Sequence, residues 1–375
     1  MTTFDDFSKA AIAHGYVPPV VPELKTITIG GAIVGIGIES SSHKFGLVHE
    51  MVEEMEVLLA DGSIVSCSRK ENSDLFFALP NSYGTLGYVI KVRVPLVKAA
   101  PYVLVRHEKF SDVTKYFLAI NQYCDSGDQD FIDGSVFAPS DLYITRGWFV
   151  HNAPYTNSYT YMKMYFKSIE ERTEDYLSVY DYLWRWDTDW FWCSKIFGVQ
   201  NKVLRFFVPF LLNSKSYWKL MQLNTRFQLT ARVKKVTGDT TKREAVVQDV
   251  EIPIENAGMF LEFFHKEIGI LPVWVCPIKP VDKTTWTLYG MKQQLYINFG
   301  FWDVIPSTHA PGYFNKKIES KVEQLKGKKS LYSESYYSKE TFWKLYNIKD
   351  YDTLKNKYDP TGKLSNLYDK CVQRY

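Results

Sequence analysis

A dense glycine cluster near the amino terminus constrains the backbone of this chain more than any other feature. The cluster consists of Gly30, Gly31, Gly35 and Gly37. It is followed by Ser40, Ser41, Ser42 and Gly46. Glycine costs backbone entropy on folding, so this density is explained where the backbone approaches another group closely or adopts positive φ. Backbone N–H groups beside hydroxyls can cradle a pyrophosphate. A glycine-rich structural turn with a serine cap would give the same pattern.

The segments around the cluster predict a small mixed region. Period-2 alternation from residue 26 predicts a strand before the glycines, and alternating runs joined at Asp61-Gly62 predict a hairpin over 50–68. The glycine spacing lacks the GxGxxG register of a nicotinamide-binding βαβ unit. The other elements expected here are a helix over 3–15, a helix over 72–79 capped by Asn72 or Ser73, and a strand over 84–97.

From residue 102 onward the predicted strands and helices follow one another in a different order. The strands and helices do not alternate as in a parallel βαβ sheet, so the class expected is α+β with an antiparallel sheet. With 375 residues the chain is long enough for two cores. Predicted strands cover 102–110, 130–138, 142–150, 245–254, 272–279 and 286–302; predicted helices cover 111–123, 160–187, 214–230, 256–268 and the tail from 336.

Cysteine, histidine and terminal patterns exclude several classes of protein. The five cysteines are scattered and never form a CxxC pair, which argues against a disulfide framework or a zinc site and fits a reducing compartment. The histidines lack metal-ligand spacing, so no metal is expected. The amino terminus does not read as a signal peptide, and no window is apolar enough for a transmembrane helix.

Residues 184–243 combine aromatic and basic side chains. WRWDTDWFWC (184–193) precedes VLRFFVPFLL (203–212), and Asp239 is the single acidic residue among many Lys and Arg between 195 and 243. The apolar run is too short to span a bilayer but can lie in its interface, with the basic residues at anionic headgroups. A core helix beside a basic surface is nearly as well supported. Nucleic acid is not the expected partner, because the aromatic residues cluster with aliphatic ones.

Three blocks in order resemble the second FAD-binding subdomain of the vanillyl-alcohol-oxidase (PCMH-type) flavoprotein superfamily. They are GGAIVGIGIESSSHKFGL, EMEVLLADGSIV and NSDLFFALPNSYGTLGYVIKVRV. Within that superfamily, PPVVPELKTITIGG, VWVCPIKP and SLYSESYYSKETFWKLY resemble the delta(24)-sterol reductase branch. The resemblance is dense at both ends of the chain and thinner from about 150 to 245.

This resemblance implies a division of the chain and a set of cofactor residues. Residues 1–98 would be part of a PCMH-type FAD-binding domain, 99–335 an α+β substrate domain, and 336–375 a helical segment packed back on the FAD-binding domain. FAD is expected to bind non-covalently. The implied contacts are Thr28, Ile29, Gly30, Gly31, Gly35, Gly37, Ile38, Ser40, Ser41, Ser42, His43, Gly46, Gly84, Thr85, Gly87, Tyr88 and Val89. The family's first FAD-binding subdomain, which should precede residue 3, is not part of this sequence, and its amino-terminal membrane segment is not either.

The resemblance also implies a reaction, in which reduced flavin delivers hydride to a sterol side-chain double bond and NADPH re-reduces the flavin. An unactivated double bond needs a positioned acid in a dry pocket. In an extended segment Tyr332, Glu334 and Tyr336 share one face, and a buried Glu334 would stay protonated. These tyrosines could equally be core aromatics beside a solvated Glu334.

Two other functions remain open on the sequence alone. One is a flavin oxidase or dehydrogenase of a hydroxylated substrate, which would need a base and no NADPH. The other is a truncated, non-catalytic remnant that binds a lipid or a partner. For the leading hypothesis the partner is a sterol or similar apolar small molecule, and the resemblance implies association with the endoplasmic reticulum membrane.

Overall fold

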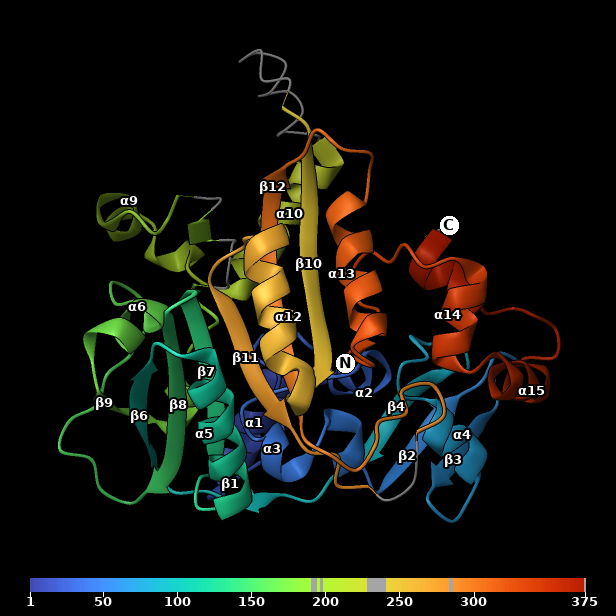
Figure 1. Cartoon of the computed structure of the whole chain (residues 1–375). Helices are drawn as coiled ribbons and strands as arrows, with labels where there is room; N and C mark the ends of the chain where they lie inside the picture. Colours follow the sequence, from blue (N-terminus) through green and yellow to red (C-terminus); the bar gives the residue numbers. More distant parts are fainter. Residues whose placement is uncertain (190–193, 196–197, 228–240, 283–285, 374–375) are drawn as a thin grey trace.

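The described part of the chain is built on an eight-stranded antiparallel sheet (Figure 1). The computed structural model describes residues 1–189, 194–195, 198–227, 241–282 and 286–373. The strand order is β13-β10-β12-β11-β7-β8-β6-β9. The strands are β6 (Tyr102–Phe110), β7 (Phe131–Ala138), β8 (Asp141–Val150), β9 (Glu174–Ser178), β10 (Arg243–Pro253), β11 (Val273–Ile278), β12 (Tyr296–Pro306) and β13 (Lys328–Lys329). This confirms the α+β class with an antiparallel sheet.

Three helices cover one face of this sheet and form an apolar core with it. They are α5 (Val113–Ser126), α12 (Ile254–Glu267) and α13 (Tyr313–Gln324), which lie in front of the sheet in Figure 1. In α12 the buried residues Ala257, Phe260, Leu261 and Phe264 follow the helical repeat and so form one stripe. Phe260 packs on Phe299 of β12, with ring centroids 4.8 Å apart.

The opposite face of the sheet is polar and aromatic, although most of it is buried. Residues directly opposite each other in an antiparallel ladder lie on the same face. Asp249 of β10 is opposite Gly300, and Gly300 is opposite Trp274. Asp133 of β7 is opposite Thr145 of β8, which is opposite His107 of β6. The sheet therefore turns its polar face toward the amino-terminal region.

The amino-terminal region combines short helices with a small sheet of order β3-β2-β4. Its hairpin turns at Gly62, whose φ of 93° suits glycine, and this confirms the predicted hairpin. Its elements are α1 (Phe4–Ile12), β1 (Tyr16–Val17), α2 (Ile29–Gly35), α3 (Ser42–Phe45), η1 (Val48–Met51), β2 (Glu54–Leu58), β3 (Ile64–Ser68), α4 (Ser73–Ala78), β4 (Tyr88–Arg93) and β5 (Val97–Lys98).

The predicted strand before the glycine cluster is wrong, because the chain forms helix α2 there. Thr28 occupies the N-cap position, and its hydroxyl accepts a hydrogen bond from the Gly31 N–H at 3.2 Å. The helix lies against β4 so closely that a Cβ on Gly30 would be 2.9 Å from the carbonyl oxygen of Val89. The glycines thus permit close packing of a helix on a strand.

Three other predictions need correction. The helix expected over 160–187 is interrupted by β9, whose alternating burial suits an edge strand beside β6. Strand β12 begins at Tyr296, well after residue 286. Asn72 occupies the N-cap position of α4, but its side chain donates to the Ser66 carbonyl at 2.8 Å and does not cap the helix. Helix α13 was not expected from the sequence.

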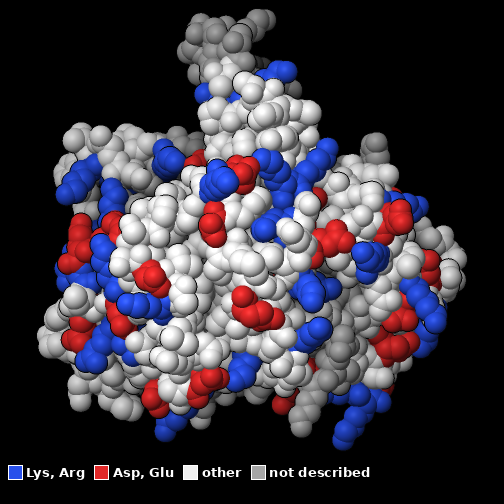
Figure 2. Space-filling view, viewed as in Figure 1, with Lys and Arg blue, Asp and Glu red and all other residues white. Residues whose placement is uncertain are grey.

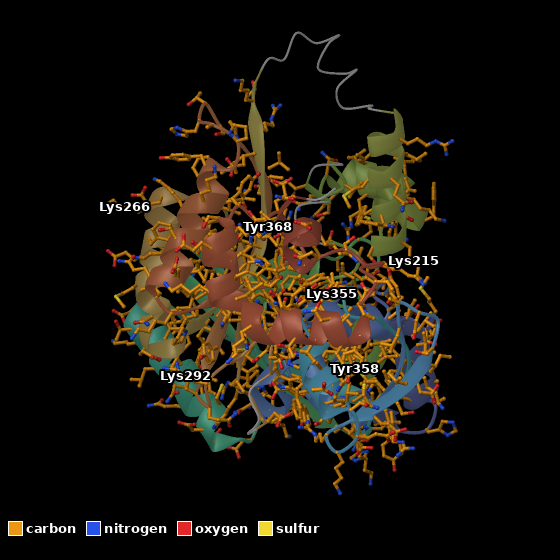
Figure 3. The ribbon with its side chains drawn as sticks, turned by 90° about the vertical axis from the view of Figure 1, so that its right-hand side faces the viewer. Lys215, Lys266, Lys292, Lys355, Tyr358 and Tyr368 are labelled. Atoms are coloured by element: carbon orange, nitrogen blue, oxygen red, sulfur yellow. The ribbon has the colours of Figure 1, made fainter. Side chains whose placement is uncertain are left out.

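The tail packs on the amino-terminal region through α15. The Lys355 ammonium donates to the Thr85 carbonyl at 2.7 Å, and the Tyr358 hydroxyl donates to Asp74 at 2.8 Å. Figure 3 shows both residues on a helix beside the blue amino-terminal ribbon. The remaining elements are α6 (Tyr165–Glu171), α7 (Val179–Leu183), α9 (Lys202–Phe207), η2 (Pro209–Leu211), α10 (Ser214–Phe227), α14 (Lys339–Tyr346), α15 (Ile348–Tyr358) and η3 (Asp369–Gln373).

A buried arginine joins the amino-terminal region to the polar face of the sheet. The Arg185 guanidinium contacts Glu39 and Asp133, each at 2.7 Å, and all three side chains are buried. Trp274 donates its indole N–H to the same Asp133 carboxylate at 3.3 Å. Because Glu39 follows the glycine cluster and Asp133 lies on β7, Arg185 fixes the position of one region on the other.

We predict that Arg185→Ala lowers the free energy of unfolding by about 3–5 kcal/mol, because two buried carboxylates lose their partner. Denaturant unfolding measures the effect. The control is Arg106→Ala, which breaks an exposed pair with Glu174 and should cost less than about 1 kcal/mol. Equal losses in the two variants would contradict the role given to Arg185.

Candidate functional site

A surface groove with a volume of about 1000 Å³ runs along the packed elements α2 and β4. Gly30, Gly31, Gly84 and Gly87 form part of its wall. A Cβ on Gly31 would lie 2.8 Å from the Thr28 hydroxyl, and one on Gly84 would lie 3.2 Å from the Tyr88 ring. The backbone is thus open to a ligand where larger residues would close the groove.

About half of the predicted cofactor residues line this groove. They are Thr28, Ile29, Gly30, Gly31, Gly84, Gly87, Tyr88 and Val89. The groove also includes residues that the sequence did not indicate, such as Val34, Tyr83, Lys91 and Arg93. The predicted residues that do not line it are Gly35, Gly37, Ile38, Ser40, Ser41, Ser42, His43, Gly46 and Thr85.

The serine run lies instead at the junction with the sheet. The Ser40 carbonyl accepts the Ile132 N–H of β7 at 2.8 Å, and its hydroxyl lies 3.1 Å from the Tyr182 hydroxyl. The Ser41 hydroxyl donates to the Pro19 carbonyl at 2.7 Å, and Ser42 accepts from the Glu39 N–H at 3.1 Å. These hydroxyls are buried and bonded within the protein.

His43 is buried in the same junction. Its Nδ1 lies 2.9 Å from the Ser40 carbonyl oxygen and its Nε2 lies 3.4 Å from that of Gln129. Burial lowers the pKa of His43 to about 4, so the ring is neutral near pH 7. The geometry is that of a histidine bonded to backbone.

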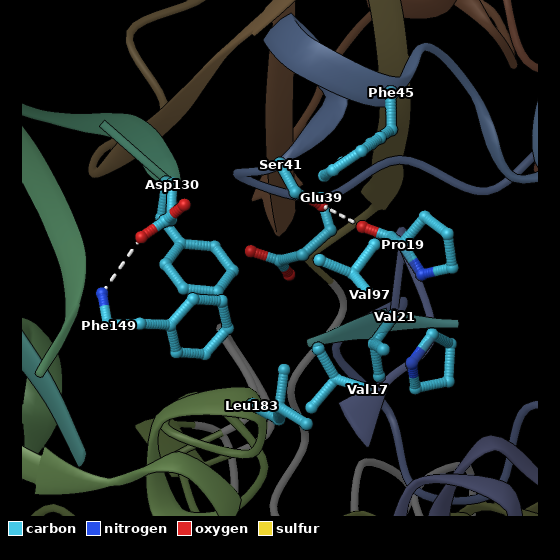
Figure 4. A pocket seen from close by; sticks show the side chains of 12 residues that line it. Val17, Pro19, Val21, Glu39, Ser41, Phe45, Val97, Asp130, Phe149 and Leu183 are labelled. Atoms are coloured by element: carbon cyan, nitrogen blue, oxygen red, sulfur yellow. Dashed lines mark hydrogen bonds between the residues drawn. The ribbon is translucent and has the colours of Figure 1, made fainter. Parts of the chain in front are cut away.

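A very small cavity lies beside Glu39, lined also by Pro19, Ser41, Phe45 and Asp130 (Figure 4). Its volume of about 10 Å³ is close to the room that one water needs. One Glu39 carboxylate oxygen has no protein hydrogen-bond partner. The cavity is therefore too small for a substrate.

The predicted catalytic residues fall into two separate groups. The Tyr332 hydroxyl donates to Asp249 Oδ2 at 2.8 Å, whereas the Tyr336 hydroxyl donates to Glu334 Oε2 at 2.7 Å. The segment around them is not a strand, but its burial alternates as expected, with Leu331, Ser333 and Ser335 buried. Glu334 is exposed, so the burial that would keep it protonated is not found.

Tyr332 belongs to a polar cluster on the polar face of the sheet. The Trp302 indole N–H donates to the Tyr332 oxygen at 3.0 Å, and the Asn298 amide donates to Asp249 Oδ1 at 2.8 Å. Burial raises the pKa of Asp249 to about 6, against the opposite effect of its two hydrogen bonds. Sequence reasoning missed Asp249, Asn298 and Trp302, because only the register of β10 against β12 brings them together.

Tyr83 connects the groove with this cluster. It lines the groove, and its hydroxyl donates to the Gly35 carbonyl at 2.9 Å. The Leu331 backbone also hydrogen-bonds the Tyr83 side chain, one residue before Tyr332. Tyr83 therefore contacts both the groove and the segment that carries Tyr332.

The described residues contain neither a metal-binding cluster nor a membrane-spanning helix. Within these ranges, no three His, Cys, Asp or Glu side chains are grouped so as to hold a metal ion. None of the described helices has the length and apolar character needed to cross a bilayer. Four of the cysteines are described, and each is buried; the fifth, Cys193, lies outside the described residues.

Comparison with known proteins identifies the groove region. A model of the FAD binding domain family matches residues 2–68, which include α2 and the first strands of the small sheet. The delta(24)-sterol reductase of Homo sapiens is 29% identical over the whole chain, which covers 73% of that protein. That of Arabidopsis thaliana is 25% identical over 99% of the chain and 72% of that protein. Cytokinin dehydrogenase 7 of Oryza sativa subsp. japonica is 30% identical over 35% of this chain and 26% of that protein. The chain is therefore similar over its whole length to delta(24)-sterol reductases, and its residues 2–68 match an FAD-binding domain.

Proposed function

We propose that this chain is an FAD-dependent reductase of a sterol side-chain double bond, with NADPH as the hydride source. The observation that carries the proposal is the groove along α2 and β4, of which the α2 side lies in the matched FAD-binding region, together with the Tyr332–Asp249 pair. The names of the similar proteins support the sterol substrate. When bound, the flavin supplies the hydride, and the protein supplies orientation and a proton.

The residues of the groove fit part of a dinucleotide. Its volume is at the upper end of the range for small-molecule sites. Backbone at Gly30, Gly31, Gly84 and Gly87 would meet the cofactor, while Tyr88 and Val89 offer apolar surface. Ser40, Ser41, Ser42 and His43 would act indirectly, by fixing this region on the sheet.

The acid in this proposal is Tyr332. The Glu334–Tyr336 pair is a weaker candidate, because Glu334 is exposed and Tyr336 turns to it. Oxidation of a hydroxylated substrate is the second candidate function. It is favoured by the carboxyl of Asp249, which is ionised above about pH 6 and could act as a base through Tyr332.

An anaerobic flavin assay tests the function. We expect NADPH to bleach the flavin of the FAD-loaded protein, and a sterol with a side-chain double bond to restore its colour. The saturated sterol is the control and should leave the flavin reduced. Bleaching by a hydroxylated substrate, without a reaction with NADPH, would instead establish the dehydrogenase. If the protein shows no flavin absorption after gel filtration, it does not retain FAD. In that case the remaining hypothesis is the truncated, non-catalytic protein that binds a lipid or a partner.

The groove itself is tested by Gly30→Ala. The added Cβ would meet the Val89 carbonyl and push α2 away from β4, at a cost of about 1–3 kcal/mol. We expect the FAD dissociation constant to rise about tenfold, measured by quenching of flavin fluorescence. Gly258→Ala in α12 is the control, since its nearest atom would be 3.5 Å away. Unchanged FAD affinity in Gly30→Ala would remove α2 from the cofactor site.

We also propose that α9 and η2 rest on a membrane surface, at the endoplasmic reticulum as the resemblance implies. Phe206, Phe207 and Phe210 are 58%, 68% and 71% exposed. The buried Arg205 holds this segment to the body through Asp189, with a closest contact of 2.5 Å. Blue side chains gather at the upper left edge in Figure 2, where α9 lies in Figure 1. Residues 190–193, 196–197 and 228–240 of the predicted segment lie outside the described residues.

Liposome co-sedimentation tests this contact. Changing Phe206, Phe207 and Phe210 to serine should reduce binding to anionic liposomes at least about tenfold, because the apolar area that enters the interface is lost. Changing the exposed Leu118 and Met259, on the helices α5 and α12 that cover the sheet, to serine is the control and should leave binding unchanged. Equal sedimentation of a folded triple variant would rule out this surface.

A further inference from the structure

The hydrogen bonds of Tyr332 depend on the protonation of Asp249. With Asp249 ionised, the Tyr332 hydroxyl donates to it at 2.8 Å. The Trp302 indole can only donate, so it always occupies an acceptor position on the Tyr332 oxygen. The Asn298 amide likewise donates to the other Asp249 oxygen in either state. The proton between Tyr332 and Asp249 is therefore the variable element of the cluster.

Protonation of Asp249 would reverse the central hydrogen bond. The carboxyl O–H would then donate to the Tyr332 oxygen, which already accepts from Trp302. The Tyr332 O–H would no longer have an acceptor in this cluster and would turn to the open side. Tyr332 is 42% exposed, so its ring borders open space and is not enclosed in the core.

The sheet leaves room for this arrangement at Gly300. A Cβ there would clash with the Trp302 ring and lie 2.7 Å from Asp249 Oδ1. Gly300 is opposite Asp249 across the ladder, so its missing side chain allows the indole and the carboxyl to meet. The segment that carries Tyr332 is fixed to the same strand, because the Ser330 N–H donates to the Asp249 carbonyl at 3.1 Å.

Other charged and titratable groups face Asp249 from its surroundings. Glu251 is two residues along the same face, hydrogen-bonded to Tyr289 and Ser330, and burial raises its pKa to about 8. Lys328 lies opposite Glu251, and burial lowers its pKa. From the amino-terminal region, Tyr83 and Glu23 both feel the charge of Asp249, and burial raises the pKa of each. The carboxyl that accepts the hydrogen bond of Tyr332 is that of Asp249, whereas Glu251 is bonded to Tyr289 and Ser330.

We propose that Asp249 supplies the proton that Tyr332 passes to the substrate double bond, an inference that rests on the proposed function. The π electrons of the double bond form a C–H bond with the Tyr332 proton, and the Tyr332 O–H bond breaks. A bound reduced flavin would supply the hydride for the remaining carbon and would thereby be oxidised. The Tyr332 oxygen takes the Asp249 proton, and the resulting carboxylate is reprotonated by water through the exposed side. Asp249 thus acts through Tyr332, which contacts the substrate.

The pH dependence of a single turnover tests the relay in the full chain loaded with reduced FAD. Asp249 carries its proton below its pKa of about 6, so the wild-type rate should fall as pH rises through about 6. Tyr332→Phe should lower the rate about 100-fold or more at every pH. Asp249→Asn should lower it about tenfold at pH 5 and remove this pH dependence. Glu251→Gln is the matched control, a buried carboxyl on the same strand that should keep the wild-type profile.

An infrared titration of the protein without flavin or sterol gives a second readout. The carbonyl band of a protonated carboxyl should disappear with a midpoint near pH 6 in the wild type and in Glu251→Gln, and this component should be absent from Asp249→Asn. Tyr332→Phe should shift that midpoint, because the hydroxyl is a partner of the carboxylate.

The outcomes distinguish a failure of the proton relay from a failure of the proposed function. If the wild type reduces the sterol and Asp249→Asn keeps the wild-type pH profile, the relay is overturned and the reductase stands. A band near pH 6 that persists in Asp249→Asn also overturns the relay. If the wild type reduces no sterol in single turnover, the proposed function fails and the relay fails with it, whatever the titration gives.

Discussion

Arg185 is the positively charged partner of two buried carboxylates, one from each region of the protein. Burial makes the geometry demanding, because charges removed from water need a partner at short distance. The interaction therefore fixes where Glu39, and with it the glycine cluster, meets β7. The positions of the groove, of Tyr83 and of the Tyr332 cluster relative to one another all depend on this attachment.

Local patterns were sufficient for much of the fold. Alternation and turn residues predicted the hairpin at Asp61-Gly62 and strand β6, because those signals act over a few residues. Helix α2 was misjudged for a physical reason. Glycines are poor helix formers, and it is the Thr28 cap and the close approach to β4 that stabilise a helix there. Strand β9 likewise depends on its pairing with β6, a tertiary contact with no local signature.

The candidate site was predictable only in part. The glycines near residues 30 and 84 line the groove, as their lack of side chains suggested. Tyr332 was found by its residue type, but its partners come from strands far away in sequence. Nothing in the run of residues around Asp249 shows that Gly300 lies opposite it or that Trp302 will reach Tyr332. Such relations exist only once the sheet has its register.

The attachment of the tail has a consequence for the order of events during synthesis. Lys355 bonds the Thr85 carbonyl beside the turn that walls the groove, and Tyr358 bonds Asp74, although some 270 to 284 residues separate the partners. The amino-terminal region leaves the ribosome long before residues 348–358 are made, so neither contact can form early in synthesis. The turn at Thr85 and helix α4 are therefore held in place by α15 only after that helix has emerged.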